Sequence, residues 1–163
     1  MGRSSGGGFR REVRCMRAFL DTNVILEFFL DREAGKTACQ LFAKLQEQKH
    51  SLYMTVGSFY TMIFLVDKYL KRERGLQGDV RLQVLRELMS DILRVIKVAG
   101  HDSASLLRGI NDLHYRDIED SCQFQAAKKA GCKVLITFNE GDYRVADDVI
   151  PRVMTPQEFL ETT

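Results

Sequence analysis

Oxygen-bearing side chains at three separate places in the chain are best suited to chemistry. They are Asp21, the acidic run at residues 117–120, and the pair Asn139 and Asp142. Oxygen ligands of this kind suit Mg²⁺ or Mn²⁺, whereas zinc is more often held by histidine and cysteine. A cation bound by them would activate a water molecule and stabilise charge on a phosphodiester during in-line attack. The residue types therefore predict a site for a hard divalent cation.

Each of these positions also has a purely structural interpretation. Asp21 begins the run Asp-Thr-Asn, and all three residue types are common helix N-caps. Asp117 and Asp120 would be favourable charges at a helix N-terminus, where each contributes about 0.3–1 kcal/mol. Asn139 suits a turn that follows a strand. The metal site is favoured over these alternatives because all the residues are expected at one edge of a sheet.

The elements that would position these residues alternate between strands and helices. Short apolar runs predict strands at residues 18–20, 51–54, 94–98, 134–137 and 151–154. Apolar periodicity and capping residues predict helices at residues 23–30, 35–48, 55–71, 80–93, 102–109, 118–130 and 156–160. We expect Asp79 to cap the helix at 80–93 and Gly131 to end the helix at 118–130. The alternation favours an α/β fold with a mainly parallel sheet covered on both faces.

Composition is that of an ordinary globular domain: 163 residues, of which 45% are hydrophobic and 28% charged. Residues 1–15 are rich in Gly, Ser and Arg, and we interpret them as a flexible leader or upstream segment before one domain at 16–163. The net charge of residues 1–15 is +3 and that of the whole chain is +2, so the net charge of residues 16–163 is −1. Net charge therefore gives no argument for nucleic-acid binding.

No apolar run is long enough to cross a membrane, and four cysteines without C-x-x-C spacing suggest reduced thiols in the cytoplasm.

Three segments of the sequence resemble the PIN domain family, and in particular the bacterial branch that includes the VapC-type toxins. The segments are Met16–Leu26 (MRAFLDTNVIL), Asp117–Ala127 (DIEDSCQFQAA) and Val134–Tyr143 (VLITFNEGDY). The resemblance extends from Met16 to Leu160. It implies a three-layer α/β/α sandwich and a metal-dependent ribonuclease site built from three or four acidic residues. Many members are toxins that a small antitoxin neutralises.

The resemblance also implies roles for individual residues. Asp21 matches the first metal-binding aspartate of the family, and Asp120 matches the aspartate at the start of the penultimate long helix. Asn139 stands where many members have an aspartate, and Asp142 matches the acid just beyond it. Supporting roles are expected of four nearby polar residues, which are Thr22, Asn23, Asp117 and Thr137.

One position departs from the family pattern. Many PIN nucleases have a glutamate on the helix after the second strand, about six residues beyond a Ser or Thr. Counting from Thr55 places Thr61 there, and no acid occurs between Thr55 and Val66. Together with the neutral Asn139, this lowers the charge available to hold a cation.

The sequence therefore predicts a Mg²⁺- or Mn²⁺-dependent endoribonuclease, the toxin of a toxin–antitoxin pair, that acts on RNA and binds an antitoxin. The long apolar helix from Phe59 to Leu70 has two interpretations: core packing accounts for most of it, or it exceeds what one small core can cover and the chain self-associates. The alternative, favoured by Thr61, is a degenerate PIN-like module that binds RNA or a protein without catalysis. A phosphohydrolase of another α/β family is less well supported, since no Gly-rich phosphate loop is present.

Overall fold

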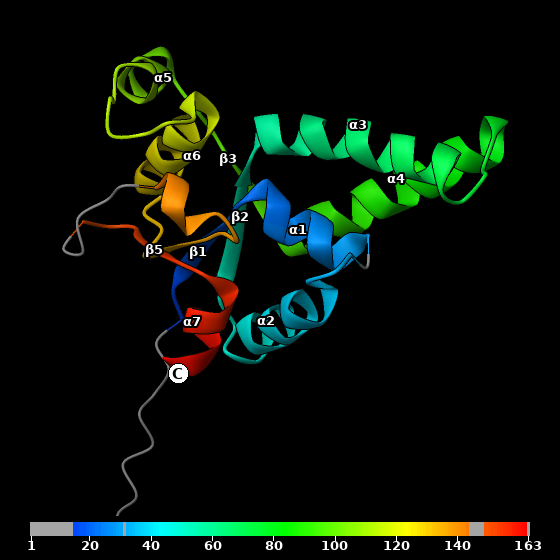
Figure 1. Ribbon diagram of the computed structural model, residues 1–163, viewed down its shortest axis with the longest axis horizontal. Coiled ribbons are helices and arrows are strands. Elements are labelled where there is room, and N and C mark those ends of the chain that lie inside the picture. Colours follow the sequence, from blue (N-terminus) through cyan, green and yellow to red (C-terminus); the bar gives the residue numbers. More distant parts are fainter. Residues whose placement is uncertain (1–14, 31, 144–148, 163) are drawn as a thin grey trace, which may run out of the picture.

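The computed structural model describes residues 15–30, 32–143 and 149–162. Its five strands form one sheet in the order β3-β2-β1-β4-β5, and every strand pair is parallel. The strands are β1 (Arg17–Leu20), β2 (Ser51–Thr55), β3 (Ile96–Ala99), β4 (Val134–Ile136) and β5 (Arg152–Met154). The predicted α/β fold class is confirmed, and β1 lies at the centre of the sheet (Figure 1).

Helices connect the strands at almost all the positions that the sequence predicts. They are α1 (Thr22–Phe29), α2 (Gly35–Glu47), α3 (Val56–Arg72), α4 (Gly78–Val95), α5 (Ser103–Ile110), α6 (Ile118–Lys129) and α7 (Pro156–Glu161), with a 3₁₀ turn η1 (Glu140–Asp142) after β4. Thr55 caps α3, since its side-chain oxygen accepts a hydrogen bond from the Ser58 N–H. After α6 the chain turns at Gly131, whose φ of 69° is in the left-handed region that glycine adopts at little cost. The predicted helix end at Gly131 is therefore confirmed.

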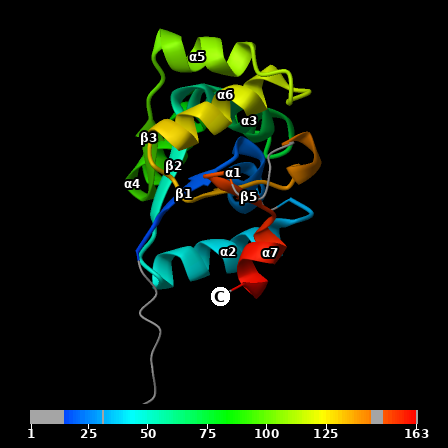
Figure 2. The same ribbon diagram turned by 90° about the vertical axis from the view of Figure 1, so that its left-hand side faces the viewer.

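Alternation along β1 divides the core into two clusters. Ala18 and Leu20 face one side of the sheet, where they pack with buried side chains of α1, α2, α3, α4 and α7. Phe19 faces the other side, where it packs with Phe124 and Ala127 of α6. Helices thus cover both faces, and the predicted three-layer sandwich is confirmed (Figures 1 and 2).

Two predicted details around α4 are wrong. The segment 94–98 was predicted to be a strand, yet α4 continues to Val95 and β3 begins at Ile96. The Ile96 N–H donates to the Ile92 carbonyl, so the helix passes into the strand without a loop, and the β-branched residues at its end belong partly to the helix. Asp79 does not cap α4, because Gln77 occupies that position and Asp79 lies in the first turn.

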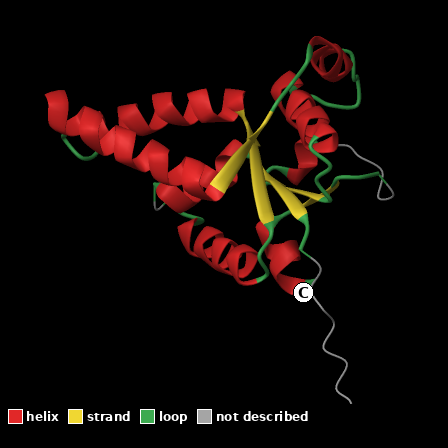
Figure 3. Ribbon diagram, turned by 180° about the vertical axis from the view of Figure 1, so that it is seen from behind, coloured by secondary structure: helices red, strands yellow, loops and turns green. Residues whose placement is uncertain are grey.

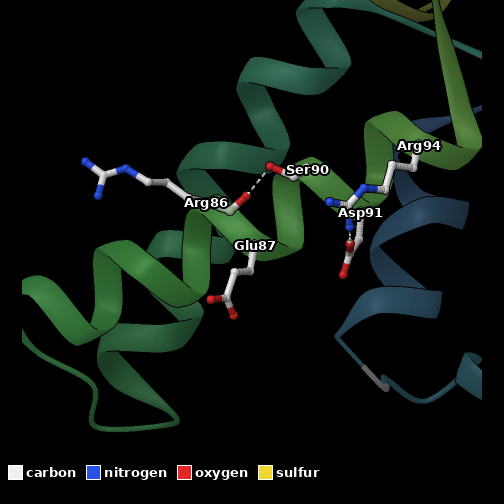
Figure 4. A pocket seen from close by; sticks show the side chains of 5 residues that line it. All are labelled: Arg86, Glu87, Ser90, Asp91 and Arg94. Carbon is white, nitrogen blue, oxygen red and sulfur yellow. Dashed lines mark hydrogen bonds and ion pairs between the residues drawn. The ribbon is translucent and has the colours of Figure 1, made fainter.

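Helices α3 and α4 form a long hairpin that projects from the rest of the molecule (Figure 3). An ion pair between Arg81 and Asp67 joins the two helices. A hollow of about 380 Å³ lies along α4 and is lined by Arg86, Glu87, Ser90, Asp91 and Arg94 (Figure 4). None of its lining residues belongs to the site predicted from the sequence. Within the described part of the chain, no helix has both the length and the apolar character needed to cross a membrane.

Candidate metal centre

Asp21 lies at the carboxyl end of the central strand β1, where only 4% of its surface is exposed. Its Oδ2 accepts hydrogen bonds from the Thr137 hydroxyl at 2.7 Å and from Asn23 Nδ2 at 2.9 Å. Asp21 is the N-cap residue of α1, but its side chain makes no capping hydrogen bond. The backbone N–H groups of Thr22 and Asn23, in the first turn of α1, are still close enough to lower the pKa of this carboxyl group, so the group faces both the helix start and other polar side chains.

Thr137 and Asn23 tie the ends of two neighbouring strands together around Asp21. The Thr137 oxygen also accepts from Asn23 Nδ2 at 3.3 Å and from the Asn139 N–H at 3.0 Å. Asn23 Oδ1 in turn accepts from the Phe138 N–H at 3.3 Å. This network holds the carboxyl ends of β1 and β4 side by side, which is the edge where ligands bind in open α/β sheets.

Asp120 is carried to the same edge by the first turn of α6. Its Oδ1 accepts a hydrogen bond at 3.3 Å from the hydroxyl of Tyr143, whose side chain is almost wholly buried. Burial raises the pKa of Asp120 to about 7, and repulsion from Asp21, Asp117 and Asp142 adds to the rise. Asp120 thus lies within electrostatic range of three other carboxyl groups, and we call these four residues the acidic cluster.

The remaining predicted residues occupy less central positions. Asp117 is exposed and caps α6, since its Oδ1 accepts from the Glu119 N–H at 2.7 Å. Thr22 is buried next to Asp21, and its hydroxyl has no hydrogen-bond partner among the described residues. The Asn139 side chain is exposed, while Asp142 is half-buried in η1. Thr61 lies half-buried on α3, and no hydrogen bond joins it to the acidic cluster within the described chain.

Three further residues lie at this site although the sequence reasoning assigned them no role. Glu119 lies close enough to Asp21 and Asp117 for their charges to raise its pKa, after the larger effect of its own burial. The Gln123 amide lies close enough to Asp21 to lower the pKa of that carboxyl group, although burial outweighs this effect and the net shift is upward. Tyr143 holds Asp120. The available signal was helical spacing, since Gln123 follows Asp120 by three residues and Glu119 by four.

The donor set fits a hard cation in chemical type. Among the described residues, no three His, Cys, Asp or Glu groups lie together as a preformed cage. Mg²⁺ is commonly held by only one or two carboxylates, with water and substrate phosphate completing its shell. The pKa of Asp120 is raised first by burial and then by the nearby carboxylates, and a bound cation would offset both effects. Asp21 and Asp120 therefore fit as a carboxylate pair for such an ion.

A hollow of about 320 Å³ adjoins this cluster through Asn23 and Asn139. Its other lining residues are Glu27, Glu33, Ala34 and Phe138. Because Asn23 donates directly to Asp21, the hollow begins one residue from the buried carboxylate. The hollow thus lies next to the Asp21 end of the cluster, on the side of α1, and its lining contains none of the four clustered carboxyl groups.

Comparison with known proteins agrees with this architecture. Residues 17–141 match the sequence pattern of the PIN domain. The chain is 28% identical over 149 residues to a protein described as Ribonuclease VapC1 from Aquifex aeolicus (strain VF5), covering 89% of this chain and 94% of that protein. A solved structure described as a toxin-antitoxin complex from Klebsiella pneumoniae superimposes with a TM-score of 0.57 at 19% identity, covering 85% of this chain and 97% of that chain.

Proposed function

This chain belongs to the PIN domain family, and from that membership we propose that it is a metal-dependent endoribonuclease, the toxin component of a toxin–antitoxin pair. The observation that carries the proposal is the pairing of two partly or fully buried carboxyl groups, Asp21 and Asp120, at the carboxyl edge of a parallel sheet. A relative described as a ribonuclease, aligned over most of both chains, supports the same activity.

In this proposal Asp21 and Asp120 hold a Mg²⁺ or Mn²⁺ ion, with Asn139 and Asp142 as further ligands, directly or through water. The cation supplies Lewis acidity and lowers the pKa of a water molecule. The protein's own contribution is to fix the two carboxyl groups. Thr137 and Asn23 each donate a hydrogen bond to Asp21, and Tyr143 donates one to Asp120. Such outer contacts orient ligands and tune the affinity for the ion.

RNA is the substrate in this proposal. The partners are a small antitoxin protein and a second copy of the chain. The proposed location is the cytoplasm. The toxin assignment is supported by the fold that the chain shares with a chain of a toxin-antitoxin complex. Thr61 is the observation that favours the rival proposal, a PIN-like module that binds RNA or protein without cleaving it. The two proposals differ in whether the acidic edge binds a cation.

The deciding experiment compares the wild type with Asp21→Asn, a nearly isosteric change that removes one carboxylate. We expect calorimetric Mn²⁺ binding to disappear and RNA cleavage to fall by about 100-fold or more, since second-shell changes alone cost 10–100-fold. Thermal stability should be equal or higher, because burial of the Asp21 charge is unfavourable. Asp91→Asn, on the exposed surface of α4, is the matched control. Cleavage that persists in Asp21→Asn would contradict the nuclease proposal.

A further inference from the structure

Gln123 is a buried polar residue with an unpartnered side-chain oxygen. Only 3% of its surface is exposed, and its Oε1 has no hydrogen-bond partner among the described residues. Buried polar atoms are almost always paired, and one left unpaired lowers stability. If Gln123 served only to fill the core, an apolar side chain of the same length would serve better. The glutamine therefore calls for an explanation other than packing.

Its position points to the acidic cluster. Gln123 is on α6, three residues after Asp120 and four after Glu119, so the three side chains leave the same face of the helix. Its amide lies close enough to the carboxyl group of Asp21 to lower the pKa of that group. Gln123 thus connects the helix that carries Asp120 to the strand end that carries Asp21.

A second buried oxygen without a partner belongs to the residue that follows Asp21 in the chain. Thr22 follows Asp21 directly, is 8% exposed, and has a hydroxyl without a partner in the described chain. The donors that reach Asp21 Oδ2 come instead from Thr137 and Asn23. Gln123 Oε1 and the hydroxyl of Thr22 are thus two buried oxygens, on a neighbour of Asp21 in space and on its neighbour in the chain, that lack a partner among the described residues. A ligand that brings several O–H donors, such as a hydrated divalent cation, would satisfy them.

We propose that Gln123 is a positioning residue of the cation site, which holds Asp21 through its amide and accepts a hydrogen bond from the cation's hydration water through Oε1. The inference rests on the metal dependence proposed above and adds a residue to it. It follows that the polar amide of Gln123 serves cation binding and not stability, so the two properties respond in opposite directions when the amide is removed.

The test replaces Gln123 with methionine, which keeps the length of the side chain but removes both its donor and its acceptor. We expect Mn²⁺ affinity, measured by calorimetry on the full chain, to weaken about tenfold or more, while the Tm stays equal or rises. Gln125→Met is the matched control, since Gln125 is on the same helix but two residues further on, and so faces a different side. Its Mn²⁺ affinity should equal that of the wild type.

The outcomes separate this inference from the proposed function. Wild-type binding that is lost in Asp21→Asn but retained within twofold in Gln123→Met overturns the inference alone. No saturable Mn²⁺ binding by the wild type overturns both. A Tm that falls in Gln123→Met assigns the residue to structural support and also overturns the inference.

A measurement without any substitution gives an independent check. In a Mg²⁺ titration of ¹⁵N-labelled wild-type protein, the side-chain amide resonances of Gln123 should shift with the midpoint of cation binding. Those of Gln125 should stay in place and serve as an internal control. An unmoved Gln123 amide at saturating Mg²⁺ would overturn the inference.

Discussion

The Asp120 carboxyl group gives the site a pH dependence whose sign follows from its surroundings. Its pKa is raised to about 7, first by burial and then by Asp21, Asp117 and Asp142. Between the ordinary value of 3.8 and about 7, the folded chain therefore binds a proton that the unfolded chain has released. Stability consequently falls as the pH rises through this range. The raised pKa values of Asp21 and Glu119 act in the same direction.

We predict that the Tm of the metal-free protein decreases between about pH 4.5 and 7.5, and that Asp120→Asn makes this decrease shallower. Scanning calorimetry at a series of pH values measures both slopes, with Asp91→Asn as a control that keeps the wild-type slope. Mn²⁺ affinity should rise over the same interval, because the cation competes with the proton for Asp120. Equal slopes in the wild type and Asp120→Asn would show that Asp120 is not the titrating group.

Tyr143 permits a second test at the scale of one atom. Tyr143→Phe removes the hydroxyl that donates to Asp120 and keeps the ring that packs edge-on against Tyr115. We expect Mn²⁺ affinity to weaken by about 3- to 10-fold, because this hydrogen bond is long, at 3.3 Å between the two oxygens, and an ordinary hydrogen bond contributes about 0.5–1.5 kcal/mol. Tyr115→Phe is the comparison, because in the described part of the chain the Tyr115 hydroxyl donates no hydrogen bond to Asp120. Calorimetric affinity in Tyr143→Phe that matches the wild type would remove Tyr143 from the site.

Among the elements, α5 supports the helix that carries Asp120 and Gln123. The two helices approach closely at Gly109, where an added Cβ would lie 2.8 Å from Cys122 Sγ and 3.0 Å from the Cys122 Cα. The Ser121 hydroxyl donates to the Gly109 carbonyl at 2.8 Å, which fixes α5 to the first half of α6. A side chain at Gly109 must therefore push the two helices apart.

We predict that Gly109→Ala destabilises the protein by about 1–3 kcal/mol, the usual cost of overpacking, and weakens Mn²⁺ binding by displacing α6. Chemical denaturation gives the stability change. The control is Gly100→Ala, since a Cβ at Gly100 would meet no atom within 4 Å. If Gly109→Ala is as stable as Gly100→Ala, α5 does not constrain α6 at this point.

The sequence predicts the elements well where a local signal exists and less well where position depends on distant residues. Alternating apolar runs and the glycine at 131 locate the strands and the end of α6. The α4–β3 junction is misplaced because no turn residue separates helix from strand there. The PIN domain assignment made from three short motifs is confirmed over residues 17–141.

The residues of the candidate site also fall into those with a local sequence signal and those without one. Asp21 and Asp120 are recognisable because acids next to strand ends and helix starts are visible in the sequence. Gln123 is not, because its importance comes from burial and from contact with Asp21, a residue 102 positions earlier. A glutamine on a helix is usually solvated, and only the packing of α6 on the sheet removes this one from water.

On the scale of the whole molecule, the hairpin of α3 and α4 leaves apolar side chains uncovered. Val56, Tyr60 and Phe64 follow one another at intervals of four along α3, so they form a single stripe. Tyr60 and Phe64 are each 66% exposed, which is unusual for two large aromatic side chains side by side. The same stripe on a second copy could pack against it around a two-fold axis.

We therefore predict that the isolated chain is a dimer, with a mass in solution twice the 18.7 kDa of one chain. Phe64→Glu should make it monomeric, because burying an unpaired carboxylate in an apolar interface is strongly unfavourable. Light scattering after size exclusion measures the mass, and an unchanged Tm at low concentration would show that the fold is intact. Leu113→Glu, at a position 94% exposed outside this stripe, should remain dimeric. A wild-type chain that is monomeric at every concentration would contradict the prediction. The exposed stripe would then be free to bind a different protein.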